Sequence, residues 1–242
     1  MKIVVYTANT GRFDNIRPPE VHDSSVPYLC FSDSPVFRDP WMPQPCPIIY
    51  PDRARNSRIP KILPHLLMDC DYSIYHDANF ALKVRPNELI GLLNGNDIAL
   101  MRHPMRSSVW EEANHCRDHV IGYSEAMDVQ TSRYRDGGLE GGLWCGGALI
   151  VRRHGEAATR FNEIWWREYA RGCSRDQIAL PWALKESGIK LLTISDNYSG
   201  SPLIARYYHA EDWPERADNP SFAEERKAAA AKESRLKELC QQ

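Results

Sequence analysis

The chain has 242 residues, of which 43% are hydrophobic, 26% are charged and 10% are aromatic. This composition is typical of a folded globular protein and excludes a disordered, collagenous or membrane-spanning chain. The formal net charge of -2 gives no overall basic surface, so it does not favour nucleic acid or anionic lipid as partners.

The cysteines and the first residues indicate a cellular compartment. The seven cysteines include no Cys-x-x-Cys pair and would leave one over if the others formed disulfides, which fits a reducing compartment best. The apolar run near the start breaks at Asn9 and Gly11, so it is too short for a signal-peptide core or a transmembrane segment. We therefore expect a cytoplasmic protein.

Apolar segments and turns predict the elements of the first half of the chain. Residues 2–8 are apolar and β-branched and end in a polar turn, which is typical of a buried strand, and residues 26–31 repeat this plan. The prolines in 35–51 predict irregular structure or an edge strand. Beyond them we expect a helix over 59–67, a strand over 72–75, a helix over 86–93 and a strand over 97–102.

The second half continues this alternation of helices and strands. Six glycines within 137–147 predict a flexible loop whose backbone can approach a ligand closely. The alternation predicts a three-layer α/β fold with a mostly parallel central sheet. The expected elements are helices over 107–126, 156–171 and 176–186, strands over 148–151 and 190–194, and a charged, alanine-rich helix at 219–242, appended to a domain of residues 1–218.

Three polar turns follow predicted strands, at Asn9-Thr10-Gly11, Ser32-Asp33 and Asp77-Ala78-Asn79. In open α/β sheets, ligands bind beyond the carboxyl ends of the strands. We therefore expect the three turns to converge on one site.

The third turn carries candidate metal ligands. A carboxylate at Asp77 and an amide at Asn79 are oxygen donors of the kind that a hard divalent cation binds. Mn²⁺ or Mg²⁺ at this place would neutralise the charge that develops on a departing nucleoside diphosphate. The alternative is an Asx-turn or a helix cap.

Six longer segments of the chain carry a family resemblance: VVYTANTGRFD, LCFSD, SRIPKILPHLLMDCDYSIYHDANFAL, RHPMRSSVWEEA, GLWCGGALIVRRH and SRDQIALPWAL. In these segments the sequence resembles the glycosyltransferase-like family of the plant and bacterial turgor and mucilage-pectin proteins and, more distantly, the glycogenin-type transferases. The resemblance implies a GT-A (Rossmann-like) fold, with Asp77-Ala78-Asn79 at the position of an Asp-x-Asp. It implies a UDP-sugar donor, a hydroxyl acceptor on a glycan or glycosylated molecule, and retention at the anomeric carbon.

The resemblance also implies roles for single residues. The end of the first strand would hold the nucleoside, with Tyr6 stacking on the base and Asp33 accepting the imide proton of uracil; core packing and a turn are the alternatives. A late histidine would complete the metal shell, and His209 is the candidate, with packing as the alternative. The other donor-binding candidates are Thr7, Ala8, Asn9 and His76, together with Gly146 and Gly147 beneath the sugar.

Two charged groups complete the predicted site. Arg58 and Lys61 lie three residues apart and would share a helix face, where fixed positive charge suits a diphosphate; a solvated face is the alternative. In Arg175-Asp176-Gln177, Asp176 is the candidate carboxylate at the transfer centre, kept ionised by Arg175, and its alternative role is a helix N-cap.

The motifs of several other enzyme classes are absent from the sequence. It contains no P-loop, no HExxH, no GxSxG and no GxGxxG after the first strand. Two alternatives to a transferase stay open. One is a catalytically silent domain that binds a sugar nucleotide or a glycan, which Asn79 in place of an acid favours. The other is a sugar-nucleotide nucleotidyltransferase.

Overall fold

The structure is a computed structural model that describes residues 1–11, 13–36, 38–119, 122–195, 198 and 200–207. His209 and the predicted helix at 219–242 lie outside these residues. Within the described part of the chain, no helix is both long and apolar enough to cross a bilayer.

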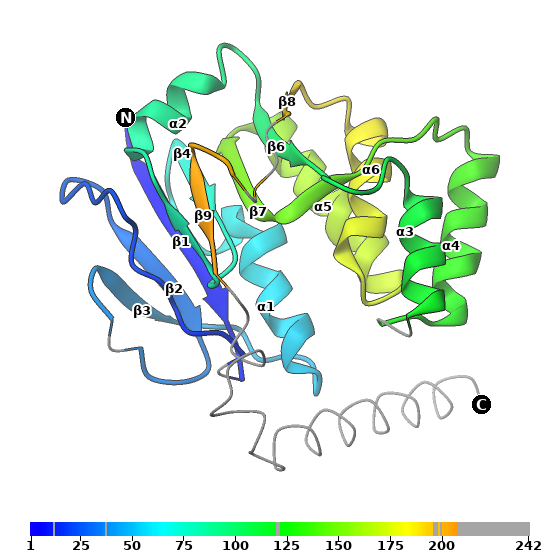
Figure 1. Ribbon diagram of the computed structural model, residues 1–242, viewed down its shortest axis with the longest axis horizontal. Coiled ribbons are helices and arrows are strands. Elements are labelled where there is room, and N and C mark those ends of the chain that lie inside the picture. Colours follow the sequence, from blue (N-terminus) through cyan, green and yellow to red (C-terminus); the bar gives the residue numbers. More distant parts are fainter. Residues whose placement is uncertain (12, 37, 120–121, 196–197, 199, 208–242) are drawn as a thin grey trace.

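A seven-stranded sheet forms the centre of the molecule, in the order β3-β2-β1-β4-β7-β6-β8 (Figure 1). Only β7 runs antiparallel to its neighbours, and the other pairings in this sheet are parallel. The predicted α/β class with a mostly parallel central sheet is therefore confirmed. The strands are β1 (Ile3–Asn9), β2 (Tyr28–Ser32), β3 (Trp41–Pro45), β4 (Tyr72–Tyr75), β6 (Ile98–Arg102), β7 (Trp144–Arg153) and β8 (Leu191–Ile194).

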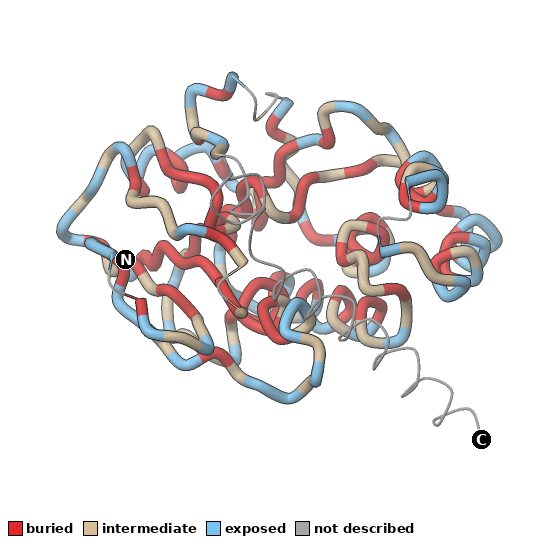
Figure 2. Tube along the Cα trace, turned by 60° about the horizontal axis from the view of Figure 1, so that its bottom comes forward, coloured by how far each residue is buried: buried red, intermediate tan, exposed pale blue. Residues whose placement is uncertain are grey.

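Two outer layers cover the sheet, because strands that are apolar on both faces need packing partners on both. Helices α1 (Arg53–Ile62), α5 (Glu156–Arg171) and α6 (Asp176–Ser187) cover one face. The other face packs against α2 (Pro86–Leu92) and the two-stranded antiparallel sheet of β5 (Phe80–Leu82) and β9 (Ile204–Arg206). The buried residues gather along the strands and on the sheet-facing sides of the helices (Figure 2).

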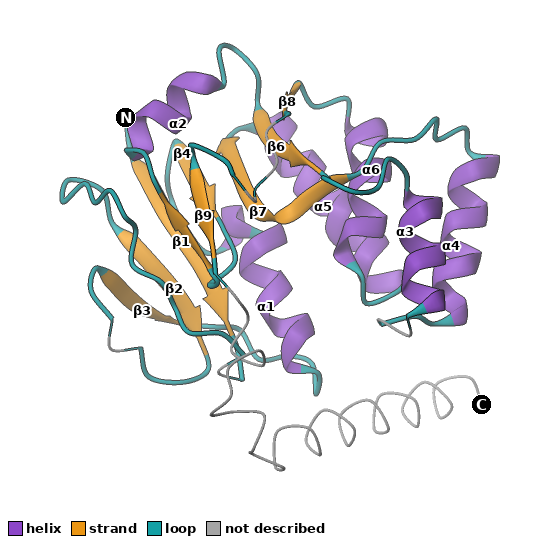
Figure 3. Cartoon of the chain, in the orientation of Figure 1, coloured by secondary structure: helices purple, strands orange, loops and turns teal. Residues whose placement is uncertain are grey.

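The predicted helix over 107–126 is wrong, because two helices occupy this region and its continuation. They are α3 (Val109–Asp118) and α4 (Glu125–Asp136), which lie side by side beyond one end of the sheet (Figure 3). Ser108 caps α3 by accepting from the Glu111 backbone N–H at 3.2 Å. The chain then turns at Gly122, whose φ of 59° suits a residue without a side chain.

Two further boundaries differ from the prediction. Helix α1 begins at Arg53 instead of residue 59, because Asp52 caps it by accepting from the Ala54 N–H at 2.9 Å, and a short 3₁₀ turn (Pro64–Leu66) follows it. Strand β7 begins at Trp144, so the last glycines of 137–147 belong to a strand and not to a loop. Strands β5 and β9, which are three residues each, are not predicted from the sequence.

Candidate active site

The carboxyl ends of β1, β2 and β4 lie at one edge of the sheet, because these strands are parallel neighbours. The turns after β1 and β2 meet there, since the Gly11 N–H donates to both carboxylate oxygens of Asp33 at 2.9 and 3.0 Å. The Thr10 hydroxyl donates to the Arg53 carbonyl at 2.6 Å, which joins the same edge to the start of α1. Asp77 follows β4, so the third turn lies at the same edge of the sheet as the other two, as the sequence predicts.

Four charged side chains form a cluster beside this edge, which we call the charge cluster: Arg58, Lys61, Asp77 and Asp176. The Lys61 Nζ lies 2.5 Å from Oδ2 of Asp176 and 3.9 Å from Oδ1 of Asp77. The Arg58 Nε lies 3.6 Å from Oδ1 of Asp176. Lys61 is only 2% exposed and Asp176 only 4%, so water screens their attraction weakly. Packing of α1 against the start of α6 thus brings the predicted phosphate-binding pair, Arg58 and Lys61, into contact with the predicted transfer-site carboxylate, Asp176.

The cluster keeps the carboxylate of Asp176 ionised. Burial opposes ionisation of Asp176, but the charges of Lys61 and Arg58 hold its pKa well below its usual range. Burial, together with the charge of Asp77, raises the pKa of Tyr75 well above its ordinary value, so its hydroxyl stays protonated and donates to Oδ1 of Asp77 at 2.6 Å. Arg175, the predicted source of charge for Asp176, contributes less than Lys61 and Arg58 do.

The two glycines of β7 have different surroundings. A Cβ at Gly147 would lie 2.0 Å from Oδ2 of Asp77, and the Gly147 carbonyl accepts from the Asp77 N–H at 2.7 Å. A Cβ at Gly146 would instead meet the Trp165 ring at 3.4 Å, on the helix-covered side. The missing side chain of Gly147 therefore makes room for Asp77. The predicted place of Gly146 beneath the sugar is wrong, because its open side faces the core.

Asp77 and Asn79 provide oxygen donors for a cation. The Asp77 side chain is 33% exposed. Asn79 is buried, its Nδ2 donates to the Tyr207 carbonyl at 3.2 Å, and its Oδ1 has no hydrogen-bond partner in the described part of the chain. A carboxylate and an unpartnered amide oxygen two residues apart fit a hard cation. The described residues contain no group of three His, Cys, Asp or Glu that could hold a metal. Ligation by His209 stays a prediction, because this residue lies outside the described part of the chain.

The predicted stacking of Tyr6 on a base is wrong. Tyr6 is fully buried, its hydroxyl accepts from Nη1 of Arg152 at 2.8 Å, and it packs on Phe31, so no face is free for a base. The His76 ring is also fully buried and lies edge-on to the Trp41 ring, at an interplanar angle of 75° and a centroid distance of 5.5 Å; its contact with the donor stays a prediction.

The other predicted nucleotide contacts have the following surroundings. The Asn9 side chain bonds to the backbone of Asp14, at 2.7 and 3.2 Å. Thr7 and Ala8 are buried at the end of β1. The Asp33 carboxylate is exposed but already accepts from Gly11 and from the Ser34 hydroxyl. Contacts of these residues with a nucleoside remain predictions.

The start of α6 fixes the position of Asp176. Asp176 is the first residue of the helix, and its carboxylate contacts Lys61, so it is not the N-cap that was the alternative. The Trp165 Nε1 donates to its carbonyl at 2.9 Å. Its neighbours point elsewhere: the Gln177 Nε2 donates to the Trp144 carbonyl at 3.5 Å, and Arg175 pairs with Glu112. Arg175 and Gln177 therefore support the helix start, while Asp176 faces the charge cluster.

Comparisons with known proteins match a large part of this chain. A family described as TOD1/MUCI70, glycosyltransferase-like domain, matches residues 46–194. The chain is 26% identical over 179 residues to "Probable hexosyltransferase MUCI70" of Arabidopsis thaliana, covering 67% of this chain and 31% of that protein. It is 30% identical over 147 residues to "Alkaline ceramidase TOD1" of the same plant, covering 54% of this chain and 31% of that protein.

The chain therefore spans about a third of the length of these curated relatives. Among solved structures, the apo form of mouse xyloside xylosyltransferase 1 matches with a TM-score of 0.48 and 10% sequence identity. That match covers 80% of this chain and 85% of the other.

Proposed function

Because the chain belongs to the TOD1/MUCI70 glycosyltransferase-like domain family, we propose that it is a glycosyltransferase that uses a UDP-sugar donor and a hydroxyl acceptor on a glycan or glycosylated molecule. The observation that carries the proposal is the buried Lys61 between the carboxylates of Asp77 and Asp176. It supplies fixed positive charge at the edge of the sheet where ligands of α/β folds bind.

Each member of the charge cluster has a defined task in this reaction. Lys61 and Arg58 stabilise the negative charge that grows on the diphosphate as the glycosidic bond breaks, because they are in place before the reaction begins. Asp176 stays ionised, so it stabilises the oxocarbenium-like centre or orients the acceptor hydroxyl. In a retaining front-face reaction, the departing phosphate takes the proton of the acceptor hydroxyl.

A divalent cation is part of the proposal. Asp77 and Oδ1 of Asn79 would hold Mn²⁺ or Mg²⁺, which as a Lewis acid neutralises charge on the diphosphate. Tyr75 and Gly147 serve this arrangement from within the protein. The Tyr75 hydroxyl fixes the rotamer of Asp77 by donating to its Oδ1, and Gly147 leaves space for Oδ2.

A silent domain that binds sugar nucleotides is the second candidate, because Asn79 gives one carboxylate fewer than an Asp-x-Asp. The two candidates differ in turnover. A transferase releases UDP from its donor and transfers the sugar when an acceptor is present, whereas a binding domain retains the donor unchanged. UDP release from a panel of UDP-sugars, measured with Mn²⁺ or with EDTA and with or without glycan acceptors, separates them.

The decisive variant is Asp176→Asn, which removes the charge and keeps the size of the side chain. We expect kcat to fall roughly 100-fold or more, while the dissociation constant of the UDP-sugar changes by less than about threefold. Asp69→Asn is the control, because Asp69 is an exposed carboxylate paired with Lys2. Activity is measured below the melting temperature of each variant. Near-normal turnover of folded Asp176→Asn would reject this catalytic role, and activity unchanged by EDTA would reject the metal.

A further inference from the structure

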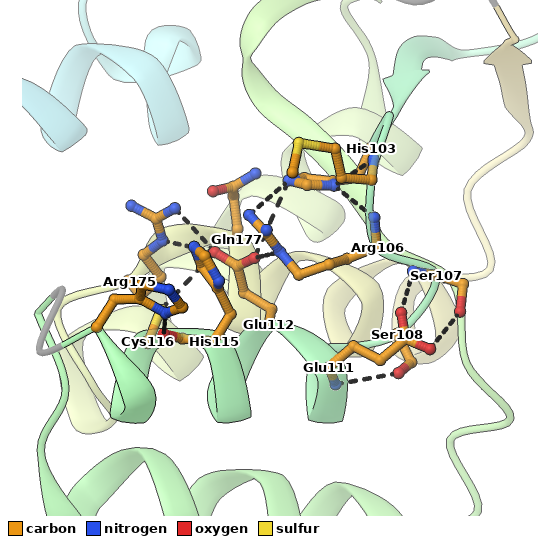
Figure 4. Close-up of polar contacts among 12 residues, drawn as sticks. His103, Arg106, Ser107, Ser108, Glu111, Glu112, His115, Cys116, Arg175 and Gln177 are labelled. Atoms are coloured by element: carbon orange, nitrogen blue, oxygen red, sulfur yellow. Dashed lines mark hydrogen bonds and ion pairs between the residues drawn. The ribbon is translucent and has the colours of Figure 1, made fainter.

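Glu112 joins three segments of the chain through one carboxylate (Figure 4). It lies on α3, is fully buried, and accepts on Oε1 from Nε of Arg175 at 2.9 Å, with the Arg175 Nη2 at 2.8 Å. Its Oε2 accepts from Nε of Arg106, in the loop that follows β6. The same carboxylate therefore holds the loop after β6 and the start of α6.

The charge of Glu112 is maintained by its two partners. Burial opposes ionisation, but Arg175 and Arg106 hold its pKa below the usual value. Arg106 is also fixed from its other side. The His103 Nδ1 accepts from the Arg106 backbone N–H at 3.0 Å, and its Nε2 lies 3.1 Å from the Arg106 Nη2. Burial and the charge of Arg106 lower the pKa of His103 to about 4, so this ring is neutral at pH 7.

Arg175 occupies a helix position for which arginine is poorly suited. It is the N-cap of α6, where Ser, Thr, Asp or Asn would bond to the helix N–H groups, and its side chain makes no capping bond. That side chain instead contacts Glu112, while the next residue, Asp176, contacts Lys61. The start of α6 therefore has no side-chain cap and is held by Glu112 instead. Such a departure from the usual N-cap residues is expected at functional sites.

We propose that Glu112 is a positioning residue: it holds Arg175 and thereby fixes the first turn of α6 so that the Asp176 carboxylate faces Lys61. This inference rests on the proposed function of the charge cluster. Glu112 acts through Arg175 and needs no contact with the substrate. The contact of Glu112 with Arg106 holds the loop after β6, whereas its contact with Arg175 holds the start of α6. The effects of losing each contact can therefore be measured separately.

The test compares Glu112→Gln with Glu168→Gln. Glu168 is also a buried carboxylate that joins two helices, because it lies on α5 and accepts from Arg133 and Tyr134 on α4. We expect Glu112→Gln to lower kcat for UDP release at least tenfold with a change of less than threefold in the KM of the donor. Glu168→Gln should retain kcat within threefold. Equal losses of kcat in the two variants would overturn the proposal.

Replacing each of the two arginines that contact Glu112 provides a second comparison, in which Glu112 itself is unchanged. Arg175→Gln should reproduce the loss of kcat, whereas Arg106→Gln should retain kcat within threefold. Hydrogen exchange gives a readout that does not depend on activity: the amides of 176–180 should exchange at least tenfold faster in Arg175→Gln than in the wild type or in Arg106→Gln. Unchanged exchange in Arg175→Gln would overturn the proposal, whether or not the wild type releases UDP. If the wild type releases no UDP, that result would reject only the proposed function.

Discussion

Replacing Lys61 by methionine tests the centre of the charge cluster. The substitution keeps the length and most of the apolar stem of the side chain but removes its charge. Asp176 would then remain buried with Arg58 as its nearest cation, 3.6 Å from its Oδ1. Removing one partner of a buried ion pair leaves an uncompensated charge, which costs about 3–5 kcal/mol.

We expect the lower end, about 3 kcal/mol, because Arg58 compensates part of the charge of Asp176. For a domain of this size, this corresponds to a fall in melting temperature of about 6–12 °C. The lowered pKa of Asp176 contributes stability that is present above the ordinary value of 3.8 and is lost as the pH falls below it. The loss is therefore measured at pH 7, where the contribution is complete.

Urea unfolding and thermal melts at pH 7 measure the loss. Lys2→Met is the matched control, because Lys2 pairs with Asp69 on the surface and should leave the unfolding midpoint nearly unchanged. A double-mutant cycle with Asp176→Asn isolates the pair: Lys61→Met/Asp176→Asn should lose clearly less than the sum of the single losses. A wild-type midpoint in Lys61→Met, or additive losses in the cycle, would show that Lys61 and Asp176 do not interact in the folded protein.

The two remaining predictions concern space and protonation. Gly147→Ala should lower kcat at least tenfold because its Cβ would displace the Asp77 carboxylate, whereas Gly146→Ala should retain kcat within a few-fold; equal activities would refute this account. His103 has a pKa of about 4 when folded against 6.5 ordinarily, so the unfolded chain binds the proton first and stability falls as the pH drops from 6.5 to 4. In His103→Asn, the melting temperature should therefore fall less between pH 7 and pH 4.5 than in the wild type.

The sequence predicts the edge of the sheet that carries the site, because polar turns mark the ends of parallel strands. Asn9-Thr10-Gly11 and Ser32-Asp33 meet where this rule places them. The sequence does not predict on which face of the sheet each side chain lies. All residues of β1 are buried, so its apolar pattern has no alternation that separates Tyr6 from Thr7. The stacking role of Tyr6 failed for this reason.

The sequence also does not predict which residues from distant segments contact one another. Lys61 and Asp176 were each candidates, but their ion pair depends on how α1 packs against the start of α6. Glu112 lies in the segment RHPMRSSVWEEA, where nothing local distinguishes it from the exposed Glu111. Burial separates the two, because only Glu112 has both Arg106 and Arg175 within reach.

The charge balance of the cluster accounts for an amide at position 79. Arg58 and Lys61 carry two positive charges, and Asp77 and Asp176 carry two negative ones. When no cation is bound, a carboxylate in place of Asn79, which is 2% exposed, would add a buried charge that Arg58 and Lys61 do not balance. The amide keeps Oδ1 available as an oxygen donor without that cost.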